Sequence, residues 1–270
     1  VMLVLSASLP IAAADAAPGT KDPVTRPIYV TQAPIVLLKD MHSGAILFSR
    51  GADKRFAPAS MAKVMTAYVV LDLIKKGELS REKLFTVSEA TWKKWNGSTG
   101  GSTMFLRSGE KVSVDDLLKG LITVSGNDAA VALAEAVGGT LEQFVAMMNR
   151  QAAAWGLANT QFKNVAGLTE AGHYSSARDL ALIAMHVLED FPEYYASYYS
   201  LKQYTYNNIR QDNRNLLLRR DPTVDGMKTG HTEAAGYCLI SSAQRDFPNG
   251  KRRLLAIVMG ADSSVSRANE

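Results

Sequence analysis

Strand-type sequence patterns occur at both ends of this chain, and helical patterns fill the middle. Near the start, apolar runs over residues 34–38 and 45–49 flank the turn His42-Ser43-Gly44, which predicts a hairpin. Near the end, runs over 237–243 and 254–259 flank a turn at 246–250. Because a sheet must bury a face against other elements, we predict one antiparallel sheet built from both ends. The predicted fold class is α+β, an antiparallel sheet flanked by helices with a helical subdomain.

The middle of the chain combines apolar residues at helical spacing with helix-capping residues. Between Ser60 and Gly77 apolar side chains recur every three or four positions, which predicts a helix. An Ala-rich run over 127–137 predicts another, ending at a pair of glycines. Capping boxes, in which a Ser or Thr precedes an acidic or amide residue by three positions, predict three more helix starts: Ser113 with Asp116, Thr140 with Gln143 and Ser176 with Asp179. Pro192 is expected to end the last of them.

The tetrapeptide Ser60-Met61-Ala62-Lys63 stands at the start of the first helical run. A serine and a lysine at this spacing lie on one face of a helix, about one turn apart. The amine can then take the hydroxyl proton, which makes Ser60 a usable nucleophile. Lys63 must be neutral to do so, and its pKa must be lowered by burial or by a neighbouring cation. Lys228 is our candidate for that cation.

Ser125-Gly126-Asn127 is predicted to lie in the turn between two helices. The hydroxyl of Ser125 can pass a proton to a leaving amine. The side-chain amide of Asn127 can bridge Lys63 and the backbone of a substrate. We therefore expect both side chains to face Ser60 across a shared cleft.

Lys228-Thr229-Gly230 is predicted to lead into an apolar strand. The ammonium of Lys228 and the hydroxyl of Thr229 suit a substrate carboxylate. Gly230 lets the strand backbone approach the substrate closely. Backbone N–H groups near Ser60 and at His231 would form an oxyanion hole for the attacked carbonyl.

The three motifs in this order are the signature of penicillin-binding proteins and related serine β-lactamases. From about residue 35 to 267 the chain resembles the low-molecular-mass penicillin-binding proteins, the serine-type D-alanyl-D-alanine carboxypeptidases. Stretches beyond the motifs share this resemblance: Asp128-Ala129, Gly167-Leu168, Tyr174-Ser175-Ser176-Ala177-Arg178-Asp179 and Val224-Asp225-Gly226-Met227. His231 after Gly230 is particularly similar to the carboxypeptidases of this group. The resemblance implies a β-lactamase/transpeptidase-like fold.

The resemblance also implies the reaction. Ser60 would attack the penultimate D-Ala carbonyl of a peptidoglycan stem pentapeptide, the terminal D-Ala would leave, and water would hydrolyse the acyl-enzyme. Penicillins and other β-lactam antibiotics mimic this dipeptide and would acylate Ser60 as covalent inhibitors. The resemblance implies no metal or organic cofactor. It assigns no group to deacylation, because Ala166 stands in a loop where some relatives carry a polar residue.

Two arginines, Arg214 and Arg267, match family arginines placed near the cleft, where either would help to hold the substrate carboxylate. In this family a β-rich domain and an amphipathic membrane-surface helix usually follow the catalytic domain. The chain stops at Glu270, so we expect membrane association only through a C-terminal segment that is absent here. We also expect this piece to be less stable than one extended through the next helix.

Three alternatives stay open beside the carboxypeptidase. An endopeptidase that cuts peptidoglycan cross-links would use the same residues. A class A β-lactamase would need a glutamate in an E-x-x-L-N pattern, and none occurs between Asn127 and Lys228. A penicillin-binding module without activity would have lost Ser60, Lys63 or Lys228, and all three are present. Tyr206-Asn207-Asn208 resembles a motif of another β-lactamase class, but it lies within a strand-like stretch, which we interpret as structural.

Composition excludes several other classes of protein. The chain has 270 residues, 47% of them hydrophobic, enough for one sizeable core. Its net charge of +4 comes from scattered Lys and Arg, so we predict no nucleic-acid partner. The lone cysteine, Cys238, excludes an internal disulfide and is expected to be a buried small hydrophobe. The four histidines show no spacing typical of metal ligands.

The N-terminal region predicts export. Residues 1–11 are apolar and alanines follow at 12–14 and 16–17, as in the end of a secretory signal peptide. We expect residues 1–17 to be a signal remnant, 18–31 an extended lead-in and 32–270 the catalytic domain. The predicted location is the periplasm or the outer face of the bacterial cytoplasmic membrane.

Overall fold

Strands from the two ends of the chain lie side by side in a single antiparallel sheet, which confirms the prediction. The computed structural model describes residues 29–96, 101–248 and 250–270, and residues 31–270 form one unit. The predicted signal remnant and the lead-in up to residue 28 lie outside these ranges. The strand order is β2-β1-β9-β8-β7, with the bounds β1 (Ile35–Asp40), β2 (Ile46–Arg50), β7 (Val224–Thr232), β8 (Gly236–Phe247) and β9 (Gly250–Ala261).

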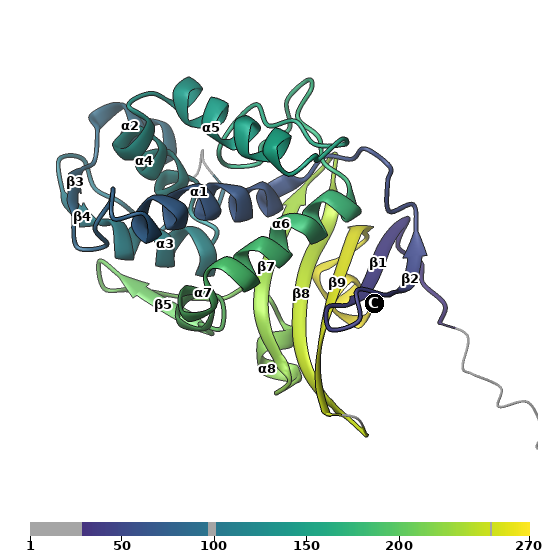
Figure 1. Cartoon of the computed structure of the whole chain (residues 1–270). Helices are drawn as coiled ribbons and strands as arrows, with labels where there is room; N and C mark the ends of the chain where they lie inside the picture. Colours follow the sequence, from purple (N-terminus) through teal and green to yellow (C-terminus); the bar gives the residue numbers. More distant parts are fainter. Residues whose placement is uncertain (1–28, 97–100, 249) are drawn as a thin grey trace, which may run out of the picture. The chain divides into compact units, whose positions relative to one another are not determined.

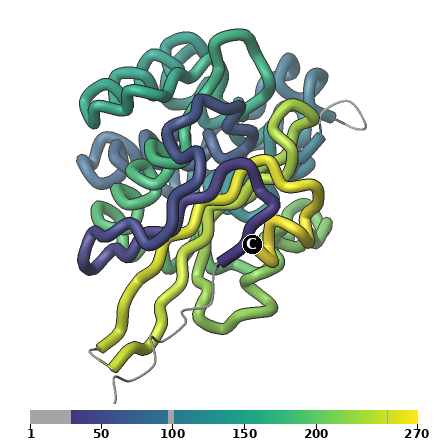
Figure 2. The backbone as a smooth tube through the Cα atoms, turned by 90° about the vertical axis from the view of Figure 1, so that its right-hand side faces the viewer, coloured from purple at the N-terminus to yellow at the C-terminus, as the bar shows by residue number. Residues whose placement is uncertain are grey.

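The pairing of residues between β1, β9 and β8 shows how the strands from the two chain ends meet. Leu37 of β1 lies opposite Ile257 of β9, and both side chains are buried. On the far side of β9, Ile257 lies opposite Ile240 of β8, so the centre of the sheet is apolar. The β8–β9 strands are longer than predicted, and their hairpin projects beyond the other strands (Figure 2).

Strand β7 is the sheet edge that matters most for the site. Lys228-Thr229-Gly230 lies inside this strand, not ahead of a strand as predicted. Residues 226–230 are all buried, and the chain preceding the first long helix packs against them. Because both faces of β7 are covered, its sequence lacks the alternation that marks a half-exposed strand.

Helices make up the other part of the fold and surround a buried central helix. A 3₁₀ turn, η1 (Ala59–Ala62), leads into α1 (Lys63–Lys75), whose residues 63–71 are all buried. A helix buried all round belongs inside a core, and Figure 1 shows α1 between the other helices. Those helices are α2 (Glu89–Trp95), α3 (Val114–Thr123), α4 (Asn127–Gly138), α5 (Leu141–Ala154), α6 (Ala177–Asp190), α7 (Pro192–Tyr198), α8 (Leu217–Arg220) and α9 (Ser264–Asn269).

The three predicted capping boxes each begin a helix. The side-chain oxygens of Ser113, Thr140 and Ser176 accept backbone N–H hydrogen bonds at 3.0, 3.2 and 3.1 Å, at the starts of α3, α5 and α6. Each cap of this kind stabilises a protein by about 1 kcal/mol. Pro192 does not simply end α6, because it is also the first residue of α7, where its missing N–H costs nothing.

Most of the helices and strands that the sequence patterns did not predict are short. Two small two-stranded antiparallel sheets, β3 (Leu84–Thr86) with β4 (Lys111–Ser113) and β5 (Gln203–Tyr206) with β6 (Ile209–Asp212), flank the helical part. Asn207 and Asn208 form the two-residue turn of the β5–β6 hairpin, with φ of 47° and 64°. Asparagine tolerates such positive φ values, so Tyr206-Asn207-Asn208 ends one strand and forms a hairpin turn, whereas we expected it within a strand-like stretch.

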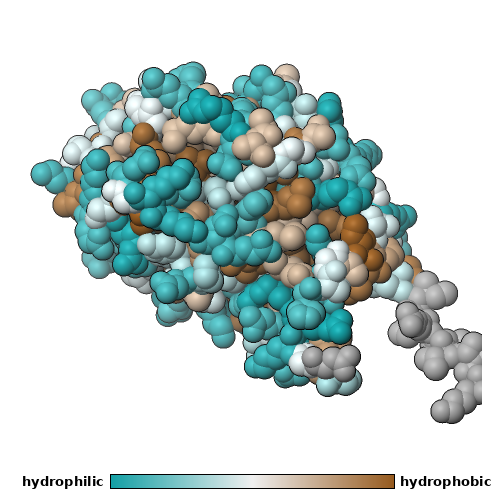
Figure 3. Space-filling view, viewed as in Figure 1, coloured by the Kyte–Doolittle hydropathy of each residue, from teal (hydrophilic) through white to brown (hydrophobic). Residues whose placement is uncertain are grey.

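The sheet lies between two helical layers. Helix α6 packs on β1, β8 and β9, whereas α9 packs on β8 and β9, and Figures 1 and 2 show the two helices on opposite faces. Figure 3 shows hydrophobic side chains gathered over β1 and β2, where Ile46 and Leu47 are 44% and 54% exposed. Within the described ranges no single helix is long and apolar enough to cross a membrane, and only the bent pair α4 and α5 passes that test together.

Candidate active site

The three predicted motifs meet at one cleft between the helical part and the edge strand β7. Its volume is about 910 Å³, and each motif contributes to its wall: Ser60, Ser125, Asn127, Thr229 and Gly230. The buried amines of Lys63 and Lys228 lie beneath this wall. The structure therefore brings together residues that are far apart in the sequence.

Ser60 and Lys63 form the centre of the site. Ser60 lies in the 3₁₀ turn and Lys63 is the first residue of α1, so the two side chains share one face. The Nζ of Lys63 lies 2.8 Å from the Oγ of Ser60. Its other neighbours are the Oδ1 of Asn127 at 2.8 Å and the carbonyl oxygen of Ala166 at 2.7 Å. Lys63 is thus fixed against the hydroxyl that it would deprotonate.

The environment of Lys63 favours its neutral form. Burial, with 1% of the residue exposed, is the main cause that lowers its pKa from 10.5 to about 7, and the positive charge of Arg214 contributes to the same shift. The carboxylate of Asp128 acts in the opposite direction. Our sequence interpretation named Lys228 as the lowering cation, whereas here that charge is the guanidinium of Arg214.

The second motif turns sharply before α4. Ser125 has a φ of 62°, a left-handed conformation that is strained for serine, and its Oγ is buried without a hydrogen-bond partner among the described residues. Asn127 begins α4, and its backbone N–H donates to the carbonyl of Ser102 at 2.7 Å. The motif therefore places the hydroxyl of Ser125 at the cleft, next to Asn127, whose backbone is held by its hydrogen bond to Ser102.

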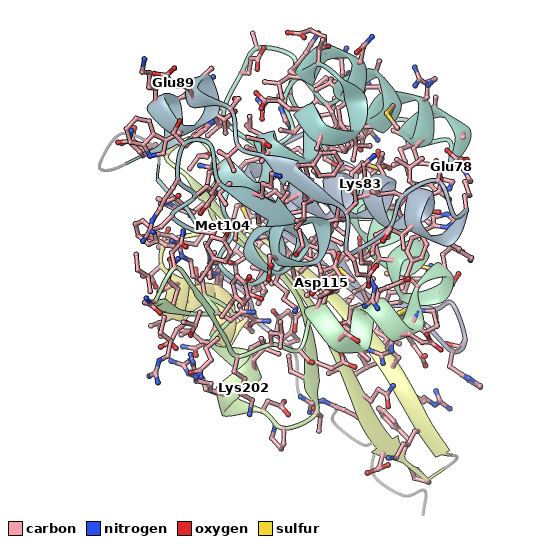
Figure 4. All side chains as sticks on the ribbon, turned by 90° about the vertical axis from the view of Figure 1, so that its left-hand side faces the viewer. Glu78, Lys83, Glu89, Met104, Asp115 and Lys202 are labelled. Carbon is pink, nitrogen blue, oxygen red and sulfur yellow. The ribbon has the colours of Figure 1, made fainter. Side chains whose placement is uncertain are left out.

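Asp128, which we did not single out for a role, fixes this turn from behind. Its carboxylate accepts hydrogen bonds from the Oγ1 of Thr103 at 2.5 Å and from the backbone N–H groups of Met104 and Leu106. Met104 lies among the helices in Figure 4 and is fully buried. The only sequence signal for this role was the position of Asp128 directly after Asn127.

Gly230 brings β7 close to the nucleophile. A Cβ at this position would lie 3.0 Å from the Cβ of Ala59 and 3.1 Å from the backbone nitrogen of Ser60. The strand backbone thus runs beside the Ser60 N–H, as the expected oxyanion hole requires. The side chain of His231, the next residue, is exposed at the cleft wall and packs on the ring of Tyr237.

Lys228 is buried beneath the cleft and donates a hydrogen bond to the carbonyl of Thr229 at 2.9 Å. Burial lowers its pKa well below the usual value, and the positive charges of Lys63, Arg214 and Arg267 lower it further. The ammonium groups of Lys63 and Lys228 therefore repel each other beneath the cleft. A bound carboxylate would relieve this repulsion.

Both predicted arginines line the cleft, but their contacts differ. Arg214 donates to the Oγ of Ser102. Arg267, on α9, donates to the carbonyls of Gly230 and Cys238 at 3.1 and 3.3 Å, and to the carbonyl of Arg214 at 3.2 Å. Arg267 therefore holds β7, β8 and the Arg214 segment together. Burial lowers the pKa of both guanidinium groups.

A loop around Ala166, which the motifs do not reveal, closes the site beside Lys63. The Oδ1 of Asn164 accepts hydrogen bonds from the N–H groups of Gly167 and Leu168 at 2.8 and 2.9 Å. Gly167 has a φ of +81°, and a Cβ there would lie 1.8 Å from the carbonyl oxygen of Ala59. The loop therefore packs directly on the residue before Ser60. At this position the loop contributes only the backbone carbonyl of Ala166 to Lys63, because alanine has no polar side chain. The loop therefore does not identify the group that activates water for deacylation.

Among the described residues, 29–96, 101–248 and 250–270, no group of His, Cys, Asp or Glu side chains would hold a metal ion. Cys238 is fully buried in β8, as predicted, and burial raises the pKa of its thiol to about 11. This thiol is therefore protonated at neutral pH.

Comparisons with known proteins agree with this geometry. The family model for D-alanyl-D-alanine carboxypeptidases matches residues 22–263. The D-alanyl-D-alanine carboxypeptidase DacC of Escherichia coli is 44% identical over 236 residues, which are 87% of this chain and 58% of that protein, so the chain spans less than two thirds of this relative.

Solved structures show the same fold. Penicillin-binding protein 5 from Haemophilus influenzae superposes with a TM-score of 0.84 at 44% identity, over 92% of this chain and 70% of that one. Penicillin-binding protein D2 from Listeria monocytogenes, solved with cefotaxime bound, gives 0.78 at 29% identity, over 90% and 96% of the two chains. The predicted β-lactamase/transpeptidase-like fold is confirmed, and the chain belongs to the D-alanyl-D-alanine carboxypeptidase family.

Proposed function

We propose that this protein is a serine DD-carboxypeptidase that removes the terminal D-alanine from peptidoglycan stem pentapeptides. The observation that carries this proposal is the contact of 2.8 Å between the Nζ of Lys63 and the Oγ of Ser60, with a pKa of about 7 for that amine. A substantial fraction of Lys63 is then neutral at physiological pH. This amine can act as a general base, which typically accelerates a reaction 10²- to 10⁴-fold, as an order-of-magnitude figure.

Acylation would proceed in two proton transfers. Lys63 takes the proton of Ser60 as its Oγ attacks the penultimate D-Ala carbonyl, and the carbonyl oxygen becomes an oxyanion. Ser125, whose hydroxyl has no partner among the described residues, gives its proton to the amine of the departing D-alanine and takes the proton held by Lys63 in exchange, which leaves Lys63 neutral again. Asn127 keeps Lys63 in place through its Oδ1. Water then hydrolyses the ester on Ser60 and completes the cycle.

Substrate binding would use the edge strand. The backbone N–H groups of Ser60 and His231 stabilise the oxyanion, a contribution that typically reaches about 3 kcal/mol per donor. Lys228, Thr229 and Arg214 bind the terminal carboxylate of the peptide. We assign a positioning role to Arg267, because its guanidinium holds the carbonyl of Gly230.

β-Lactam antibiotics would acylate Ser60 because they mimic the scissile dipeptide. The cefotaxime complex of the Listeria relative supports this expectation. The substrate lies in the cell wall, so the protein would act after export, in the periplasm or on the outer face of the cytoplasmic membrane.

The glutamates of the middle region argue against a class A β-lactamase. Glu135 accepts hydrogen bonds from Ser88 and Thr91, and Glu170 accepts one from Asn164. Neither is a partner of Lys63 or Ser60, so neither is placed to activate water there. Rapid hydrolysis of penicillin is therefore not expected.

The deciding experiment measures free D-alanine released from a D-Ala-D-Ala-ended pentapeptide by the wild type and by Ser60→Ala. We expect release by the wild type alone, and a fluorescent penicillin should label the wild type alone. A labelled wild type that cleaves only cross-linked dimeric peptides would identify an endopeptidase. A folded wild type that neither labels nor releases D-alanine would be a module without activity.

A further inference from the structure

The cleft contains a second source of positive charge that the proposed chemistry does not use. Lys94 and Trp95, at the end of α2, line the same cleft as Arg214 and Arg267. Among the described residues that line it, three are Lys or Arg and none is Asp or Glu. A cleft lined by charges of one sign selects ligands of the opposite sign.

Lys94 is placed on a different element from the groups assigned to the terminal carboxylate. Lys228 and Thr229 belong to β7 and Arg214 lies between β6 and α8, whereas Lys94 comes from α2, which packs on α4. The Nζ of Lys94 lies over the ring of Trp95, 5.4 Å from its centroid, and Trp95 is only 6% exposed. The indole gives this lysine a fixed apolar base at the cleft wall.

The size of the cleft allows more than the terminal dipeptide to enter. A volume of about 910 Å³ is near the upper end of the range for pockets that bind small molecules, which extends to roughly 1,000 Å³. The residue before D-Ala-D-Ala can therefore lie inside this cationic space. In stem peptides that residue ends either in an amine alone, as in lysine, or in a carboxylate as well, as in a diamino dicarboxylic acid.

We propose that Lys94 makes the enzyme select stem peptides whose residue before D-Ala-D-Ala carries a side-chain carboxylate. This inference rests on the proposed function. A carboxylate at that position is attracted by Lys94, whereas a lone amine is repelled and finds no acidic partner among the described residues of the cleft. Lys94 is thus a specificity determinant that takes no part in the chemical steps.

The neighbouring lysine provides a matched control. Lys93 is on the same helix, but it does not line the cleft, and its ammonium forms an ion pair with Glu89 at 2.6 Å. Figure 4 shows Glu89 on α2 at the outside of the molecule. Lys93→Glu and Lys94→Glu change the net charge equally, so a difference between them reports the position of the charge.

The test uses three peptides of the form acetyl-X-D-Ala-D-Ala, in which X is 2-aminopimelate with a carboxylate, Nε-acetyl-lysine without charge, or lysine with an amine. The readout is kcat/KM for D-alanine release by the wild type, Lys94→Glu and Lys93→Glu. We expect the wild type to prefer the carboxylate peptide over the amine peptide by about tenfold, with a smaller preference at high salt. Lys94→Glu should abolish or reverse this preference, and Lys93→Glu should keep it within about twofold.

The outcomes separate this inference from the function on which it rests. Equal kcat/KM for the three peptides, or equal effects of the two lysine substitutions, would overturn the selectivity while D-alanine release still supports a carboxypeptidase. No release from any of the three peptides by the wild type would overturn the proposed function and the selectivity together.

Discussion

The amine of Lys63 donates a hydrogen bond to the Oδ1 of Asn127 over 2.8 Å, between residues 64 positions apart in the sequence. Its other two partners, the Oγ of Ser60 and the carbonyl of Ala166, are also uncharged. The amine is therefore fully hydrogen-bonded, yet no anion among these partners stabilises its charged form. Burial, together with the positive charge of Arg214, then lowers its pKa to about 7.

Asn127→Asp should move the pH dependence of acylation upward. In the wild type, the rate constant for acylation by penicillin should rise as the pH passes about 7, because Lys63 loses its proton there. A carboxylate in place of the amide would lie in contact with Lys63 and favour its charged form, raising its pKa by about one unit or more. Stopped-flow acylation rates between pH 5.5 and 9.5 measure the midpoint. An unchanged midpoint with a folded variant would contradict the role of Lys63 as the base.

The two arginines should differ in their effect on the same pH profile. The positive charge of Arg214 lowers the pKa of Lys63, whereas Arg267 makes no resolved contribution to it. Arg214→Gln should therefore shift the midpoint of acylation to higher pH. Arg267→Gln should lower the rate at every pH, because the carbonyl of Gly230 loses its guanidinium partner, but it should leave the midpoint in place. Equal midpoint shifts in both variants would show that Arg214 acts only through the structure of the cleft.

Local signals explain which parts of the fold could be predicted. The helices capped by Ser113, Thr140 and Ser176 were predicted correctly because a capping box is complete within four residues. Strand β7 was predicted to follow Lys228-Thr229-Gly230, whereas it begins at Val224 and contains these residues. It was missed because its burial on both faces depends on η1 and on the rest of the sheet. Such tertiary contacts leave no periodic pattern in the sequence.

The same distinction applies to the site. The motifs around Ser60 and Lys228 could be predicted because each is a short run of residues, and their order along the chain matches a known signature. The supporting groups could not, because a carbonyl at Ala166 or a carboxylate at Asp128 acquires its role only from the fold around it. Likewise Arg214 acts on Lys63 only because the folded chain places it beside the cleft.

His173 should make the fold sensitive to acid. It is 5% exposed, its Nδ1 accepts a hydrogen bond from the backbone N–H of Lys163, and its Nε2 has no partner among the described residues. Burial lowers its pKa from 6.5 to about 4. The unfolded chain thus binds a proton at a higher pH than the folded chain, so this contribution to stability is complete above pH 6.5 and is lost as the pH falls toward 4, by about 3 kcal/mol.

Urea unfolding of the wild type and His173→Asn between pH 4 and 7.5 tests this linkage. Asparagine can still accept a hydrogen bond from Lys163 but does not titrate. We expect the stability of the wild type relative to the variant to fall with pH over that window, with equal m-values for the two proteins. A difference that stays constant with pH would show that His173 does not titrate as a buried group.

Gly167→Ala should impair acylation more than it impairs folding. The new methyl group would lie 1.8 Å from the carbonyl oxygen of Ala59, so either the loop or the turn that carries Ser60 must move. Movement of the loop would also displace the carbonyl of Ala166, which is a partner of Lys63. A misplacement of about 1 Å at a reacting group can cost roughly 10²-fold in rate, and we expect a loss of that size in acylation by penicillin.

Gly44→Ala is the matched control for this substitution. Gly44 has a φ of +73°, close to the +81° of Gly167, but a Cβ there would meet nothing within 4 Å. Both variants therefore incur the backbone strain of alanine at positive φ, about 1 kcal/mol, and only Gly167→Ala adds a collision beside the nucleophile. Thermal melts should show a destabilised Gly44→Ala that keeps its wild-type acylation rate. If Gly167→Ala lost no more activity than Gly44→Ala, the loop would not position Ser60 and Lys63, and their alignment would depend on Asn127 and β7 alone.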